Sequence, residues 1–137
     1  MPYLNAEAPR RSILLIDDDE LVAGSLRDHL LSKGWAVDVA LEPDAAAGYL
    51  SGGQYGVVVI DPYMTGGVHA AGTSLLADIR ASQPQSSIIV LTGYGSHDLA
   101  RSASADPSTM LLSKPQSVTD LSALIQRIPS TSLERSL

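Results

Sequence analysis

Polar residues suited to phosphoryl transfer stand at the ends of four short apolar runs. Each run has the length of one buried strand. The residues that follow the runs directly are an acid pair, a lone aspartate, a threonine and a lysine: Asp17 and Asp18, Asp61, Thr92, and Lys114. In an open parallel sheet the carboxyl ends of the strands share one edge, and ligands bind at that edge. We therefore expect these side chains to converge there.

The chemistry of such a group is that of a cation and a phosphoryl anion. Three converging carboxylates repel one another by roughly 4 kcal/mol per pair at about 4 Å and an effective dielectric constant near 20. The cluster is stable only if it takes up a proton or binds a cation. Carboxylate oxygens are hard ligands that favour Mg²⁺, and Mn²⁺ is an alternative. Asp61 is our candidate nucleophile, because aspartate forms acyl phosphates. The Thr92 hydroxyl and the Lys114 ammonium would hold the other phosphoryl oxygens.

The elements that must position these residues alternate along the chain. Apolar runs predict five strands, at residues 13–16, 35–40, 57–60, 88–91 and 110–113. Between and after them lie five helical patterns, within residues 20–34, 43–53, 73–83, 96–105 and 118–128. The fourth pattern is weak, and we expect a short or mobile helix there. Strict alternation with short apolar strands is typical of a parallel sheet covered on both faces. We predict a single-domain, doubly wound α/β sandwich of three layers.

Local signals predict where the helices begin and end. Asp19 and Glu20 suit the positive N-terminus of the first helix, and Gly34 suits its C-terminal end. Thr73 is the expected cap of the third helix, and Ser117 begins a capping-box pattern at the fifth. These assignments give Asp19 and Glu20 a structural role rather than a place in the site.

Composition narrows the classes of function. The 137 residues suit one domain, for which we expect limits of 12–128, with a flexible extension at 1–11 and a flexible tail at 129–137. The formal net charge of −6, with scattered basic residues, argues against direct nucleic-acid binding. The chain has no cysteine, which rules out a disulfide framework or a thiolate nucleophile. No apolar stretch approaches the ~20 residues of a membrane span, so we expect a soluble cytoplasmic protein with no membrane attachment.

The order and spacing of these residues resemble the receiver domain of two-component response regulators (CheY-like), from about residue 12 to residue 128. The resemblance implies a flavodoxin-like parallel sheet of order 2-1-3-4-5. It also implies that Asp61 is the phosphoacceptor, that Asp18 binds the metal directly and that Asp17 acts through water. The backbone carbonyl of Tyr63 falls where the family uses a main-chain metal ligand.

Further roles and partners follow from the same resemblance. Thr92 matches the switch hydroxyl of the family, and Lys114 matches its lysine before proline. A histidine kinase or histidine phosphotransferase would donate the phosphoryl group. The module would catalyse its own phosphorylation and dephosphorylation without being an enzyme that turns over a substrate. A downstream protein would bind the face formed by the fourth helix, fifth strand and fifth helix, and a phosphorylation-dependent dimer is a further expectation.

Several positions depart from the family pattern. Leu111 stands where the family has an aromatic switch residue, and Gln116 stands where an aromatic residue often follows Lys-Pro. Pro62 follows the acceptor directly and removes a backbone N–H. The loop after the third strand is about three residues longer than usual. Phosphate binding is therefore better supported than the family's aromatic relay of the signal.

Three other readings remain open on the residues alone. A haloacid-dehalogenase-like phosphatase would use Asp17 as its nucleophile, but Leu21 does not fit that family's first motif, and the chain has no room for a cap segment. A flavodoxin-like cofactor module would offer hydroxyls in its first loop, where this chain has three acids. A receiver that no longer cycles, and serves only as a docking module, is the third.

Overall fold

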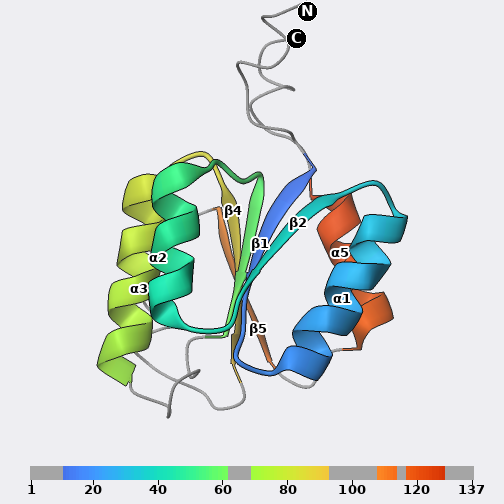
Figure 1. The fold of residues 1–137 in the computed structure, drawn as a ribbon, viewed down its shortest axis with the longest axis horizontal. Helices are drawn as coiled ribbons and strands as arrows, with labels where there is room; N and C mark the ends of the chain where they lie inside the picture. Colours follow the sequence, from blue (N-terminus) through green and yellow to red (C-terminus); the bar gives the residue numbers. More distant parts are fainter. Residues whose placement is uncertain (1–10, 62–68, 93–107, 114–116, 129–137) are drawn as a thin grey trace, which may run out of the picture.

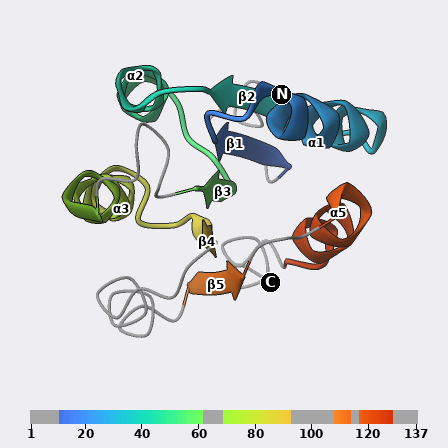
Figure 2. The same ribbon diagram turned by 90° about the horizontal axis from the view of Figure 1, so that it is seen from below.

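The computed structural model describes residues 11–61, 69–92, 108–113 and 117–128, of which residues 69–75, 92 and 113 are described by their backbone alone. A central parallel sheet has helices on both faces (Figure 1). The strand order is β2-β1-β3-β4-β5. The view from below the sheet shows this order and the two helical layers (Figure 2). The predicted doubly wound, three-layer α/β sandwich of order 2-1-3-4-5 is confirmed.

The strands lie in the predicted places, with ends shifted by no more than one residue. They are β1 (Ser12–Ile16), β2 (Ala36–Ala40), β3 (Val57–Ile60), β4 (Ser87–Thr92) and β5 (Thr109–Ser113). The register pairs Ile16 of β1 with Ala40 of β2 on one side and with Ile60 of β3 on the other. Three neighbouring strands therefore end level with one another, and the residues that follow them emerge side by side.

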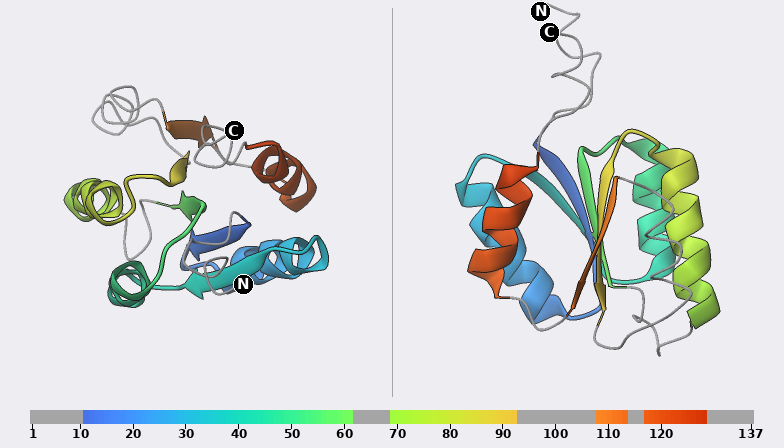
Figure 3. Two further views of the ribbon diagram at one scale, coloured as in Figure 1. Left: turned by 90° about the horizontal axis from the view of Figure 1, so that it is seen from above. Right: turned by 180° about the vertical axis from the view of Figure 1, so that it is seen from behind.

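Four helices belong to the described part of the chain: α1 (Glu20–Ser32), α2 (Pro43–Gly52), α3 (His69–Ser82) and α5 (Val118–Arg127). Helices α1 and α5 cover one face of the sheet, and α2 and α3 cover the other (Figures 1 and 3). The expected fourth helix, at 96–105, lies outside the described residues.

The helix ends follow the local signals, with one exception. Asp19 caps α1 and Ser117 caps α5 through side-chain oxygens. Gly34, just after α1, has a φ of 90°, a conformation that glycine adopts without steric cost. The prediction that Thr73 caps the third helix is wrong, because α3 already begins at His69. The alanines that follow His69 are strong helix formers, which favours the earlier start.

Alternating strand residues build two separate cores. On the α2 and α3 face the buried side chains come from alternate positions such as Leu14, Val58 and Val90. The intervening positions, such as Leu15 and Val59, pack against α1 and α5. This alternation follows from the two-residue period of a strand. The sheet is therefore packed on both faces, and its carboxyl edge is where the residues that follow the strands emerge.

A buried polar network ties the end of α2 to the start of β3 and the end of α3. The Gln83 side chain accepts a hydrogen bond from the Tyr55 N–H at 3.0 Å and donates to the carbonyls of Leu50 at 3.2 Å and Gly53 at 2.8 Å. The Tyr55 hydroxyl donates to the Asp38 carboxylate at 2.7 Å. Burial of the Tyr55 ring, and then the Asp38 carboxylate beside it, raise the pKa of the Tyr55 hydroxyl. The network satisfies backbone groups that would be costly to bury alone.

Candidate cation and phosphoryl site

The acidic side chains of the site follow directly from the ends of β1 and β3. The Asp17 N–H donates to the carbonyl of Ala40 at 3.0 Å, which extends the pairing of β1 with β2 by one residue. The Asp61 N–H donates to the carbonyl of Ile16 at 2.9 Å and extends the pairing of β3 with β1 in the same way. Because both aspartates occupy equivalent positions after paired strand residues, the side-chain alternation places them on the same side of the sheet.

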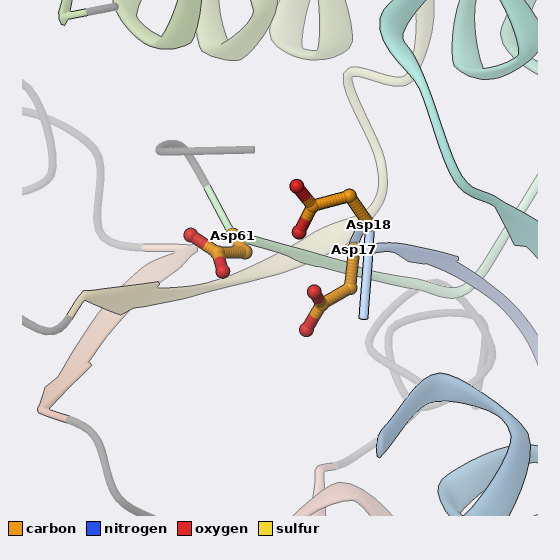
Figure 4. Close-up of side chains that lie close together, drawn as sticks. All are labelled: Asp17, Asp18 and Asp61. Atoms are coloured by element: carbon orange, nitrogen blue, oxygen red, sulfur yellow. The ribbon is translucent and has the colours of Figure 1, made fainter. Parts of the chain in front are cut away.

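The three carboxylates come together at this edge. One oxygen each from Asp17, Asp18 and Asp61 can be chosen so that all three lie within 4.8 Å of one another. Asp17 and Asp61 are each only 7 % exposed, whereas Asp18 is exposed. Figure 4 shows the three side chains gathered at the ends of the two strands. The predicted convergence of the acid pair and the lone aspartate is therefore what the structure shows.

Hydrogen bonds from backbone N–H groups to aspartate side chains hold the short segment between β1 and α1. The Asp19 N–H donates to Oδ1 of Asp17 at 2.9 Å. Oδ1 of Asp19 in turn accepts from the N–H groups of Leu21 at 3.1 Å and Val22 at 3.2 Å. The helix-terminal role expected for Asp19 is confirmed. Sequence reasoning missed the bond from the Asp19 N–H to Asp17, although an aspartate side chain often accepts from the N–H two residues on, in an Asx turn.

The donor set fits a small divalent cation. Carboxylate oxygens are hard ligands, and Mg²⁺ is bound by a few such oxygens together with retained waters and phosphate oxygens. In an octahedral site with bonds of about 2.1 Å, ligand atoms lie roughly 3.0 or 4.2 Å apart. The limit of 4.8 Å on the separations in the cluster is close to this range. The three carboxylates could therefore share one ion, either directly or through a retained water.

The structure does not describe the side chains of the other three predicted site residues. Thr92 is the last residue of β4, which runs next to β3, but its side chain is not among those described. Lys114 and Tyr63 lie outside the described residues. The described strand β5 ends at Ser113, the residue before Lys114 in the sequence, and β5 runs parallel to β4. The roles of these three residues stay predictions.

Comparison with known proteins places the chain in a family. Residues 13–126 match the sequence model of the response regulator receiver domain. The photosynthetic apparatus regulatory protein RegA of Rhodobacter capsulatus is 30 % identical over 111 residues, which are 81 % of this chain and 59 % of RegA. The transcriptional regulatory protein FixJ of Bradyrhizobium diazoefficiens is 33 % identical over 114 residues, which are 83 % of this chain and 54 % of FixJ.

A solved structure agrees with this. A response regulator protein from Burkholderia pseudomallei, crystallised with a phosphorylated aspartic acid, a calcium ion and citrate, has a TM-score of 0.72 and 30 % sequence identity. The similarity covers 92 % of this chain and 72 % of that protein.

The fold is that of a doubly wound parallel sheet with its acidic site at the carboxyl edge. The chain belongs to the response regulator receiver domain family, the signalling modules of two-component systems. This assignment decides against the phosphatase and the flavodoxin-like cofactor module. The chain spans between half and two thirds of the length of the curated relatives named above. Among the residues that the structure describes, no helix combines the length and the apolar character needed to cross a membrane.

Proposed function

We propose that the chain accepts a phosphoryl group on Asp61, from the phosphohistidine of a histidine kinase or histidine phosphotransferase, with Mg²⁺ bound at the acid cluster. The observation that carries this proposal is the approach of the buried Asp61 carboxylate to Asp17 and Asp18, within 4.8 Å, at the carboxyl edge of the sheet. A nucleophilic carboxylate and two further acids for a cation are what aspartyl-phosphate chemistry requires.

Each residue has one task in the proposed transfer. An oxygen of Asp61 attacks the phosphorus as the bond from phosphorus to the donor's histidine nitrogen breaks. The donor ring carries a proton on its other nitrogen, so it leaves as neutral imidazole while the acyl phosphate forms. A cation bound by the acids would neutralise charge on the phosphoryl oxygens and on the carboxylates. Asp18 would bind it directly, Asp17 through water, and the Tyr63 carbonyl would be a main-chain ligand. The Thr92 hydroxyl and the Lys114 ammonium would bind the remaining phosphoryl oxygens.

A relative supports the choice of ligand class. The Burkholderia pseudomallei response regulator carries both a phosphorylated aspartic acid and a calcium ion. Calcium and magnesium share a preference for oxygen ligands, and Mg²⁺ is the smaller, more strictly octahedral ion. Three acids supply few protein oxygens, which suits Mg²⁺ with its retained waters better than Ca²⁺ with its six to eight oxygen ligands, and Mn²⁺ would be a substitute.

The proposal extends to the context of the module. We infer a cytoplasmic signalling domain, bounded by residues 12–128, that catalyses its own phosphorylation and the loss of its phosphoryl group. A downstream protein would bind the face that includes β5 and α5, and dimerisation would depend on phosphorylation. Because Leu111 of β5 is not aromatic, the signal must reach that face by another route than an aromatic switch.

The direct test is incubation of the full chain with acetyl phosphate and Mg²⁺, followed by intact-mass measurement. We expect wild type to gain the mass of one phosphoryl group, and Asp61→Asn to gain none. Asp44→Asn, which removes an exposed acid from the first turn of α2, is the matched control and should be phosphorylated like wild type. Wild type that stays unmodified, while its Mg²⁺ binding is intact, would indicate the non-cycling docking module instead.

A further inference from the structure

Asp19, the third acid of the run after β1, caps helix α1 and is hydrogen-bonded to a carboxylate of the cluster. Asp19 is not a member of the carboxylate cluster, which consists of Asp17, Asp18 and Asp61. Its Oδ1 accepts two hydrogen bonds from the first turn of α1. Its own N–H donates to Oδ1 of Asp17 at 2.9 Å. One residue therefore joins the start of a helix to a carboxylate of the cluster.

These bonds restrict the backbone on both sides of Asp18. Before it, the Asp17 N–H is bound to the carbonyl of Ala40 at the end of β2. After it, Asp19 is held in an extended conformation, with φ −86° and ψ 100°, by its cap bonds to α1. The carbonyl of Asp19 also accepts the first intrahelical bond, from the Ala23 N–H at 2.9 Å. Asp18 is thus the single residue between two anchored neighbours.

We propose that Asp19 is a positioning residue for the cation site: its cap of α1 holds Asp17 and Asp18 in the geometry that binds the ion. The inference rests on the proposed function, because it takes the acid cluster to be the Mg²⁺ site. Its physical basis is preorganisation. A cap that keeps the segment ordered before the ion arrives removes the cost of ordering it on binding. Groups behind the metal ligands commonly change metal affinity in this way.

Two substitutions separate the cap from the charge. Asp19→Ala removes both the side-chain acceptor and the negative charge. Asp19→Asn removes the charge but keeps an equally good cap. If capping is what matters, only the alanine variant loses Mg²⁺ affinity. If the negative charge simply attracts the cation, both variants lose it.

A third variant controls for general destabilisation. Ser117 caps α5 as Asp19 caps α1, with its hydroxyl accepting from the Asp120 N–H at 3.0 Å. Ser117→Ala therefore removes one cap of similar strength and leaves the acid run unchanged. A purely structural role of Asp19 would make Asp19→Ala and Ser117→Ala alike in their Mg²⁺ affinity.

The experiment is a Mg²⁺ titration of the full-length, ¹⁵N-labelled chain at constant ionic strength, followed by amide chemical shifts. We expect the Mg²⁺ Kd of Asp19→Ala to rise about fivefold, which is about 1 kcal/mol at 1.4 kcal/mol per tenfold change. Asp19→Asn and Ser117→Ala should stay within about twofold of wild type, and amide exchange at Leu21 and Val22 should quicken in Asp19→Ala alone.

The results for the variants distinguish the positioning role from the proposed function. An unchanged Kd in Asp19→Ala, or an equal loss in Asp19→Asn, overturns the positioning role and leaves the proposed function standing. An equal loss in Ser117→Ala overturns it as well, because affinity would then follow stability. A wild-type chain that binds no Mg²⁺ overturns both this inference and the metal site on which it rests.

Discussion

Replacing the proposed phosphoacceptor by a neutral residue should stabilise the metal-free protein. The carboxylate oxygens of Asp17, Asp18 and Asp61 lie within 4.8 Å of one another. Two unit charges at about 4.8 Å repel by about 0.9 kcal/mol in water and by about 3.5 kcal/mol at an effective dielectric constant near 20. Asp61→Asn removes two of the three pairs, so the relief lies between about 2 and 7 kcal/mol. The hydrogen bond from the Asp19 N–H to Asp17 and the exposure of Asp18 to water offset part of the repulsion, so we expect a gain of about 2 kcal/mol.

The assay is thermal and urea unfolding in a chelator at low ionic strength. A gain of about 2 kcal/mol should raise the Tm by roughly 5–10 °C in a domain of this size. The difference should shrink as NaCl screens the charges, and also on addition of Mg²⁺, because the ion stabilises wild type by about 2.7 kcal/mol at a hundred times its Kd.

The matched control is Asp44→Asn, which neutralises an exposed acid in the first turn of α2. Its effect should be within about 0.5 kcal/mol and slightly destabilising, since an acid at that position suits the helix dipole. An Asp61→Asn variant that is no more stable than wild type in the chelator would refute the reasoning. So would a gain in stability that neither salt nor Mg²⁺ reduces.

The polar network at the opposite end of the sheet carries the remaining predictions. Tyr55→Phe should cost about 1–2 kcal/mol of unfolding free energy in urea, because it leaves the Asp38 carboxylate without its 2.7 Å bond. Since burial raises the pKa of Tyr55 above its ordinary value of 10.0, ionisation is disfavoured in the folded state; wild-type stability should hold below pH 10 and fall above it. The Phe variant should lose less between neutral pH and pH 11, and parallel curves would contradict this assignment. Gln83→Ala should lower the unfolding free energy by about 2–4 kcal/mol, because three backbone groups lose their hydrogen-bond partner. The control Gln54→Ala, at an exposed position, should change the unfolding free energy by less than about 0.5 kcal/mol. A Gln83→Ala variant as stable as Gln54→Ala would contradict the role of the network.

The sequence by itself determined the architecture and the composition of the site. Apolar runs such as 57–60 have no polar residue that could face water, so they had to become strands buried on both faces. The acids and the threonine stand directly at the strand ends, and parallel strands put such residues at one edge. Local chemistry likewise determined the caps at Asp19 and Ser117, because capping depends on residues within one turn of the chain.

Only the tertiary structure decided how these parts meet. The level ends of β1, β2 and β3 result from interstrand register, which brings the Asp17 and Asp61 carboxylates within 4.8 Å across more than forty residues of chain. Residue types therefore specify which groups can react, whereas packing between distant segments sets the distances on which their reaction depends.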